Sequence, residues 1–552
     1  MAFSSISFLF YFLPLFFIIY YLLPARAKNV VLLAGSLFFY AWGEPQWILL
    51  LLASILVTWL LGRAMRPEAS AGRRRGLLIL GLVFQLGLLV AVKYAGFFFG
   101  AFIDLPKLHL PLGVSFYTFH AISYLVDVYR QKTPPQKNLL RLGLYLALFP
   151  KLVMGPIVPY HELEPALAQR TPSVQDVSDG CFRFTIGLAK KALLADALAG
   201  LVTGIWGDLA SLTVLSAWLG LIGYALQLYF DFSGYSDMAI GLGRMLGFRF
   251  PENFRYPYLC SSISDFWRRW HISLGSWFKE YLYFPLGGSR AGTLRTLRNL
   301  LLVWLATGLW HGASWNYVLW GLYFGVLICL EKLLAPRFRA HPRKGLLAGL
   351  YRPVCLLLAV LGWVLFRAED LPAAGRYFAC LFGGAAGASA QARLYLHDFW
   401  PVLLLGAVGA TPLCAKLAGR LGAKLQPGVR AAGVLSAVVV PRLEVELADL
   451  IELVVAGVVD GAVLLVAERV GVLDEHDAVV PRELLGVVAE VGGAHEFLGD
   501  LVLGLRPRAL PTVRLAAVVD GDGVLSEPLR DLLVCLEVAP AKEQRRVAVA
   551  LD

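Results

Sequence analysis

The sequence predicts an all-α integral membrane protein, a multi-span helical bundle rather than a soluble enzyme. Of its 552 residues, 58% are apolar and only 16% are charged, whereas soluble domains are roughly 45–50% apolar and about a quarter charged. The apolar residues lie in long continuous blocks, without the alternation of a membrane β-barrel. Aromatic residues make up 12% of the chain, which suits a bundle with aromatic belts at both membrane surfaces.

Eleven or twelve apolar blocks are long enough, or nearly long enough, to cross a bilayer as helices. They cover residues 6–23, 29–42, 46–62, 76–103, 112–129, 139–158, 181–206, 211–243, 299–315, 316–334, 353–366 and 400–418. Pro150 and Pro156 interrupt one block, and such breaks are tolerated only where protein or a water-filled cavity covers the freed backbone groups. Some segments are therefore expected to be re-entrant or amphipathic.

Basic loops predict the orientation of the spans, because Lys and Arg are retained on the cytoplasmic side. Basic residues follow the first block at Arg26 and Lys28, and they recur in the loops at 63–75 and 130–141. Two apolar blocks separate each basic loop from the next, so these loops are expected on one side. The N-terminus is therefore expected outside, and the basic stretch 268–298 is expected in the cytoplasm.

The last part of the chain has a different composition from the rest. Residues 1–435 carry 40 Lys and Arg against 19 Asp and Glu, a net charge of +21, whereas residues 436–552 carry 10 against 20, a net charge of −10. Phe497 is the only aromatic residue of the second part. We predict a membrane domain at 1–435 and an atypical acidic Val/Ala/Leu-rich tail at 436–552. The tail is either a soluble appendage or the product of a shifted reading frame. The second alternative predicts low order after about residue 430.

His271 lies in a predicted amphipathic helix at the cytoplasmic interface. Ser264 or Asp265 is a suitable N-cap for this helix. An apolar stripe recurs at helical spacing, formed by Trp267, Trp270, Leu274, Trp277 and Tyr281. Arg268 and Arg269 occupy other faces, and His271 lies beside the stripe, from where it can point inward. The alternative is an interfacial histidine satisfied by water or a lipid headgroup.

His311 interrupts an apolar block that begins at Leu300. An ionisable residue at membrane depth is costly and is a functional candidate by default. A neutral imidazole there could accept a proton, since its unperturbed pKa is about 6.5. Gly308 and Gly312 flank it, and glycines let another backbone or a substrate approach closely. The alternative is a structural histidine that hydrogen-bonds across helices.

A third polar cluster at 229–237 contains Asp231 and Asp237. The two carboxylates are six positions apart, so they lie about 600° apart around a helix and do not share a face. This spacing argues against a paired-carboxylate site. A polar helix break or a hydrogen-bond network inside the bundle is the alternative to a substrate-binding role for Asp231.

Other chemistry-bearing patterns do not occur in the sequence. The seven cysteines are scattered without a C-x-x-C pair, so neither a disulfide framework nor a thiolate metal site is expected. No phosphate-binding P-loop, dinucleotide fingerprint or H-E-x-x-H helix is present. The basic stretches are short and separated by spans, so no nucleic-acid partner is expected.

Several long stretches resemble the membrane-bound O-acyltransferase family, in particular its bacterial branch typified by the membrane subunit of alginate O-acetyltransferase. The matching stretches are SLFFYAWGEP (36–45), LPLGVSFYTFHAISYLVDVYR (110–130), FPKLVMGPIV (149–158), YFDFSGYSDMAIGLG (229–243), FPENFRYPY (250–258), FWRRWHISLGSWFKEYLYFPLGG (266–288) and TGLWHGASWNYVLWGLYFG (307–325). The resemblance covers roughly residues 3–410. It does not extend to the acidic tail, where members of this branch continue with further aromatic-bearing spans.

The resemblance implies a helical enclosure with a tunnel across the membrane, open to acyl-CoA on the cytoplasmic side and to the acceptor outside. His311 matches the catalytic histidine of the family, and His271 matches its second motif histidine. Acetyl-CoA is implied as the acyl donor, with no bound cofactor and no metal. Arg268 and Arg269 are candidate contacts to its phosphates.

The chemistry that the resemblance implies is acyl transfer, with His311 as general base on an acceptor hydroxyl that attacks the thioester. An oxyanion donor is also needed, and Trp310, Asn316 and His271 are candidates. The acetyl group would pass through periplasmic or membrane-anchored partner proteins to an exported polysaccharide such as alginate, from the bacterial inner membrane. Composition alone also permits a secondary transporter with a His/Asp proton relay, which the lack of internal repeats disfavours.

Overall fold

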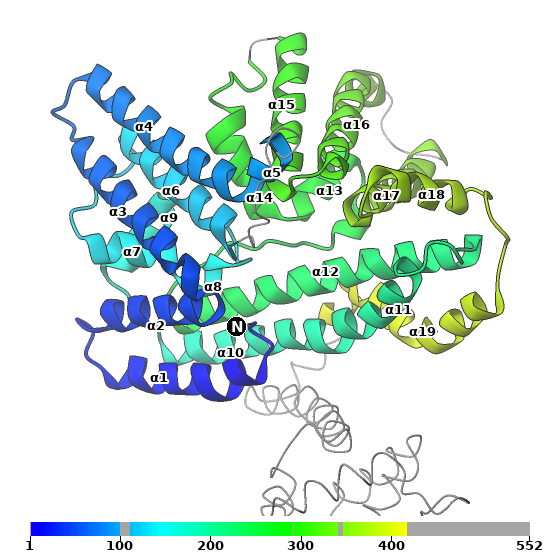
Figure 1. Ribbon diagram of the computed structural model, residues 1–552, viewed down its shortest axis with the longest axis horizontal. Coiled ribbons are helices and arrows are strands. Elements are labelled where there is room, and N and C mark those ends of the chain that lie inside the picture. The colour runs from blue at the N-terminus through cyan, green and yellow to red at the C-terminus, as the bar shows by residue number, and fades with distance from the viewer. Residues whose placement is uncertain (1, 100–110, 291, 341–345, 417–552) are drawn as a thin grey trace, which may run out of the picture. The chain divides into compact units, whose positions relative to one another are not determined.

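The structure is a computed structural model that describes residues 2–99, 111–290, 292–340 and 346–416 (Figure 1). These residues form helices joined by turns and short loops, and no strand occurs among them. The prediction of an all-α protein is confirmed for this part of the chain. The predicted domain boundary at 435 and the predictions for the tail at 436–552 lie outside the described residues.

The helices follow one another closely, and short π-helical or 3₁₀ stretches carry the label η. The first group is η1 (Ser7–Phe12), α1 (Leu13–Leu22), α2 (Lys28–Gly43), η2 (Pro45–Trp47), α3 (Ile48–Ala64), α4 (Ala71–Leu89), η3 (Val90–Tyr94), α5 (Ala95–Phe99), α6 (Val114–Tyr129), α7 (Leu139–Ala147), α8 (Phe149–Leu152) and α9 (Tyr160–Ala168). The second group is α10 (Val174–Ala189), η4 (Lys190–Ala195), α11 (Asp196–Trp206), α12 (Val214–Met245), η5 (Pro257–Leu259), α13 (Ile263–Arg269), α14 (Ile272–Phe278), η6 (Lys279–Tyr283), α15 (Thr293–His311), α16 (Trp315–Ala340), α17 (Leu346–Arg367), α18 (Leu371–Leu381) and α19 (Ala390–Gly409).

The 32-residue helix α12 is the central element and contacts α10, α11, α17, α18 and α19 (Figure 1). A reciprocal capping box between Thr213 and Ser216 starts it, which satisfies backbone N–H groups that would otherwise lack partners. Its crossing with α10 requires glycine, because a Cβ at Gly187 or Gly234 would lie under 3.0 Å from the facing backbone. The backbones of α10 and α12 therefore touch directly.

The polar cluster at 229–237 lies within α12 without a break. Asp237 pairs with Lys190 at 2.7 Å, and Asp231 pairs with Lys191 at 2.7 Å. Both lysines belong to η4, the π-helical stretch that joins α10 to α11. Of the two structural alternatives, a helix break does not occur, because α12 continues through the cluster while both carboxylates form ion pairs with η4.

Two aromatic clusters fill the interior around the ends of α13, α15 and α16. The larger includes Trp267, Trp270, Trp304, Trp320, Phe324 and Trp363. The smaller includes Phe119, Ile157, Trp277, Phe278 and Trp310. The ring of His311 contacts both clusters, because its centroid lies 4.8 Å from that of Trp310 and 4.9 Å from that of Trp320.

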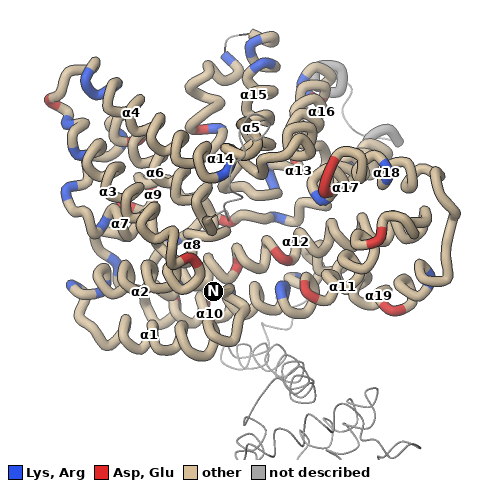
Figure 2. The backbone as a smooth tube through the Cα atoms, in the orientation of Figure 1, with Lys and Arg blue, Asp and Glu red and all other residues tan. Residues whose placement is uncertain are grey.

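Five helices of the described chain are long and apolar enough to cross a membrane. They span Pro45–Ala64, Ala71–Phe99, Val214–Met245, Trp315–Leu334 and Leu350–Arg367. Lys and Arg gather at helix ends, for example at the turn between α3 and α4, and the helix interiors carry few charges (Figure 2). This arrangement confirms a membrane protein, whereas the count of eleven or twelve segments and the cross-membrane tunnel stay predictions.

Candidate active site

His271 lies at a break between two short helices. The N-cap of α13 is Ser262, not Ser264 or Asp265. Trp270 is extended, and His271 has a φ of 45°, in the left-handed region, between α13 and α14. The predicted continuous amphipathic helix is therefore wrong, although its apolar residues do face the core.

The break follows from hydrogen bonds to the extended segment that precedes α13. The N–H of Arg255 donates to the carbonyl of Arg269 at 2.9 Å, and the N–H of Ile272 donates to the carbonyl of Asn253 at 3.0 Å. These long-range bonds replace the helical bonds that would continue α13. His271 thereby turns into the core and keeps only 3% of its surface exposed.

Asn253 fixes the protonation pattern of His271. Its Oδ1 accepts from the N–H of Ser273 at 3.1 Å and lies 3.2 Å from Nδ1 of His271. Because the backbone N–H identifies Oδ1 as an acceptor, Nδ1 of His271 is the donor of the second bond. Burial lowers the pKa of His271 to about 3, so the imidazole is neutral and Nε2 is an acceptor. Among the described residues, Nε2 is buried and has no hydrogen-bond partner.

His311 is the last residue of α15 and is half-buried. The indole of Trp310 contacts both predicted histidines, with its ring centroid 6.2 Å from that of His271 and 4.8 Å from that of His311. Phe366 of α17 covers the other side of His311, with ring centroids 5.1 Å apart. The two histidines that were selected from separate motifs therefore pack against the same indole.

Glycines at the end of α15 allow α16 to approach closely. A Cβ at Gly308 would lie under 3.0 Å from the carbonyl oxygen of Tyr317, and a Cβ at Gly312 would overlap the Tyr317 ring. Gly321 faces Gly308 with similar closeness. The prediction that small residues beside His311 let another backbone approach is confirmed.

Lys93 and Tyr94 hold the end of α15 in place, and the sequence analysis missed both. The ammonium of Lys93 donates to the carbonyls of Trp310 and His311, the latter at 3.3 Å, and the Tyr94 hydroxyl donates to the carbonyl of Leu309. These carbonyls lack helical partners because α15 ends there. Both donors lie in η3, a π-helical stretch of the kind often found at functional sites. A lysine within an apolar span was the available signal.

Trp310 and Asn316 differ in their free polar atoms. The indole Nε1–H of Trp310 is buried and has no partner among the described residues. Asn316 donates its Nδ2 to the carbonyl of Ala368 at 2.7 Å, and its buried Oδ1, an acceptor, has no partner within the described part of the chain. Of the three oxyanion candidates, Trp310 therefore offers an unused donor, whereas neutral His271 offers an acceptor.

The other predicted site residues are Arg268, Arg269 and Asp231. Arg268 is exposed, and Arg269 pairs with Asp265 at 3.1 Å one turn earlier on α13. Asp231 pairs with Lys191 and Asp196 shares the same ammonium. No contact of these three predicted residues with His271 or His311 is found in the described part of the chain, so their roles stay predictions.

One group of possible metal ligands occurs among the described residues. Ligand atoms of Asp127, His161 and Glu280 lie within 4.8 Å of one another. Asp127 already accepts from His161 at 2.8 Å and from the Tyr281 hydroxyl at 2.9 Å, and Glu280 pairs with Lys132. These contacts satisfy the cluster without an ion, so its geometry does not require a metal.

A membrane-embedded helical bundle that brings two imidazoles and an indole together is suited to acyl transfer. The sequence model of the membrane-bound O-acyltransferase family matches residues 38–358. The chain belongs to this family and is an O-acyltransferase of the membrane.

Curated relatives agree with this assignment. The chain is 44% identical over 396 residues to a protein named probable alginate O-acetylase AlgI from Pseudomonas aeruginosa, covering 69% of this chain and 75% of the relative. It is 36% identical to a peptidoglycan O-acetyltransferase of Helicobacter pylori, covering 68% and 78% of the two chains. It is 29% identical to a teichoic acid D-alanyltransferase of Bacillus subtilis, covering 41% and 62%.

Proposed function

We propose that this chain passes an acetyl group from cytoplasmic acetyl-CoA across the bacterial inner membrane for O-acetylation of an exported cell-surface polysaccharide such as alginate. Periplasmic or membrane-anchored partner proteins receive the acetyl group on the outer side. The observation that carries the proposal is the packing of His271 and His311 against one indole, that of Trp310. Relatives named alginate O-acetylase, at 44% identity, support acetyl as the acyl group and a polysaccharide as the final acceptor.

His311 is the proposed general base. It lies at the end of α15 and is half-buried. An acceptor hydroxyl gives its proton to the imidazole as its oxygen attacks the thioester carbonyl. A C–O bond forms, the C–S bond then breaks, and the imidazolium returns the proton to the departing thiolate. A positioned base of this kind contributes about 10²–10⁴-fold to the rate.

His271 has a different proposed role because its environment differs. It is buried, and Asn253 Oδ1 accepts a hydrogen bond from its Nδ1–H. The remaining Nε2 can only accept a hydrogen bond while the ring is neutral. His271 would therefore orient the acceptor hydroxyl or a water, rather than stabilise negative charge.

The unused indole N–H of Trp310 is the proposed donor to the oxyanion of the tetrahedral intermediate. For binding of the acyl donor, Arg268 is exposed, and the N–H groups of its guanidinium suit the phosphates of acetyl-CoA. Arg269 already binds Asp265 and would contribute less. These assignments make Arg268 the stronger of the two predicted contacts to acetyl-CoA.

The proposal is tested by the acetyl-ester content of surface polysaccharide in cells that carry the parent chain, His311→Ala or His397→Ala. His397 is an exposed histidine on α19 whose ring contacts only its neighbour Asp398 among the described residues, so it controls for loss of an imidazole. At matched membrane abundance, we expect ester with the parent and with His397→Ala, and a loss of about 10²-fold or more with His311→Ala.

Equal, nonzero ester levels with the parent and His311→Ala would reject His311 as the base. Release of free thiol from acetyl-CoA by membranes, measured alongside, separates a missing partner protein from a missing activity. Solute uptake driven by a proton gradient, with no thioester consumed, would instead favour the transporter alternative.

A further inference from the structure

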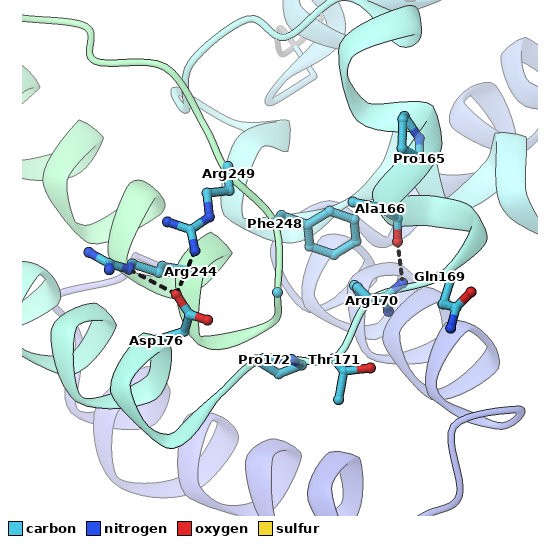
Figure 3. A pocket seen from close by; sticks show the side chains of 11 residues that line it. Pro165, Ala166, Gln169, Arg170, Thr171, Pro172, Asp176, Arg244, Phe248 and Arg249 are labelled. Atoms are coloured by element: carbon cyan, nitrogen blue, oxygen red, sulfur yellow. Dashed lines mark hydrogen bonds and ion pairs between the residues drawn. The ribbon is translucent and has the colours of Figure 1, made fainter.

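A cavity of about 270 Å³ opens where α12 ends, outside the histidine site (Figure 3). The segment between α9 and α10 forms one wall and includes Arg170. The turn after α12 forms the other wall and includes Arg244, Phe248 and Arg249. We call this cavity the arginine pocket. Its volume is several times the roughly 30 Å³ that one water occupies in the liquid, so it has room for a phosphate group.

The charges at the arginine pocket do not balance. Asp176 pairs with Arg249 at 2.8 Å and with Arg244 at 3.4 Å, and Arg244 also pairs with Asp179 at 2.5 Å. Two carboxylates therefore face two of the three arginines. Arg170 is the third, and its positive charge has no carboxylate partner among the described residues.

Neutral groups hold Arg170 in a fixed position. Its Nε donates to the carbonyl of Leu246 at 3.0 Å, and its Nη1 donates to Asn29 Oδ1 at 2.6 Å. The guanidinium also stacks on the ring of Phe248, 4.4 Å from the ring centre. Its Nη2 is buried and has no hydrogen-bond partner in the described part of the chain. A fixed guanidinium whose charge is not neutralised by a carboxylate attracts an anion, and little entropy is lost on binding because the side chain is already held in place.

The position of the pocket identifies phosphate as the suitable anion. Tyr20, at the end of the first apolar helix, donates to the carbonyl of Leu246 at 3.2 Å, and Lys28 lies over its ring at 5.1 Å. The pocket therefore lies on the side of the Arg26–Lys28 loop, which the positive-inside rule assigns to the cytoplasm. Phosphate groups are abundant there, both in anionic lipid headgroups and in soluble phosphate compounds. Arginine forks match phosphate oxygens with paired hydrogen bonds.

We propose that the arginine pocket binds a phosphate group, attracted by the positive charge of Arg170, which no carboxylate of the described residues neutralises, and contacted by the exposed side chain of Arg249. This site is separate from the histidine site and does not rest on the proposed function. The phosphate belongs either to an anionic lipid headgroup or to a soluble phosphate ester, and both present the same oxygens to the guanidinium.

The test uses the full chain, purified in a neutral detergent, and titrates it separately with dihexanoyl phosphatidylglycerol, coenzyme A and inorganic phosphate. Binding is followed by calorimetry or by the shift of the unfolding temperature. Gln169, an exposed residue that lines the pocket next to Arg170, is changed to Glu. Gln169→Glu keeps the size of the side chain and removes none of the contacts that hold Arg170, so the fold is retained. The control is Gln391→Glu, the same change at an exposed position of α19.

We expect saturable binding of at least one probe by the parent and by Gln391→Glu. With Gln169→Glu, the new carboxylate competes for Arg170, and the affinity falls by about tenfold or more, equivalent to about 1.4 kcal/mol. Binding of the lipid alone identifies a headgroup site, and binding of coenzyme A or phosphate identifies a soluble ligand. The proposal is overturned if no probe binds saturably, or if Gln169→Glu binds as tightly as Gln391→Glu.

Discussion

At the residue scale, Asn253 links the segment before α13 to the start of α14, because its Oδ1 accepts hydrogen bonds from both His271 and Ser273. We expect Asn253→Leu to leave buried donors without partners, at a cost of about 1–3 kcal/mol for each group. The unfolding temperature in detergent and the acyl-transfer activity should both fall. Ser236→Ala is the matched control, since it removes only the partner of Asn253 Nδ2. Full activity in folded Asn253→Leu would show that His271 needs no orienting group.

Lys93 offers a second prediction at this scale, because it binds the backbone of His311 rather than its ring. Removing a hydrogen bond from a charged group costs about 1.5–3 kcal/mol, so Lys93→Met should lower kcat by about tenfold or more. Lys93→Arg should recover part of this loss, because it keeps a positive donor. The KM for the proposed donor, acetyl-CoA, should stay unchanged in both variants. A raised KM with a normal kcat would instead place Lys93 in substrate binding.

At the scale of helices, the crossing of α15 and α16 depends on glycine. A Cβ at Gly308 would overlap the Tyr317 carbonyl, so Gly308→Ala should separate the helices and cost about 1–3 kcal/mol, as overpacking does. Gly87→Ala in α4 is the control, because nothing lies within 4 Å of its added Cβ and alanine favours a helix. Unfolding temperatures compared in one detergent give the result. An unchanged value for Gly308→Ala would mean that α16 yields without cost.

At the scale of the whole molecule, the sequence predicts the long helical blocks, whereas the roles of the two histidines stay predictions. The predicted block at 46–62 corresponds to the span Pro45–Ala64, and the block at 211–243 corresponds to α12. Continuous apolar runs of this length have few alternatives to a membrane helix. His271 and His311 were recognisable from the motifs that surround them, and the structure brings both to Trp310.

The features that the sequence did not predict depend on contacts between distant residues. The helical spacing of apolar residues continues through Trp270 and His271, and only bonds to the segment at 253–255 interrupt the helix there. Lys93 lies 218 positions from His311, so local patterns cannot pair them. Asp231 is a carboxylate within an apolar block, which made it a candidate for binding. In the structure it forms an ion pair with Lys191, and the sequence pattern alone does not reveal this pair.

The contacts of Asn253 also have a consequence for recombination between related genes. Its side chain accepts a hydrogen bond from the imidazole of His271, and its backbone carbonyl accepts one from the N–H of Ile272. Residues 253–273 are therefore expected to be inherited together, although they lie in two separate motifs. A gene crossover between two diverged relatives within this interval would join halves that had adapted to different partners, whereas a crossover in the exposed turn between α3 and α4 would leave these residues together.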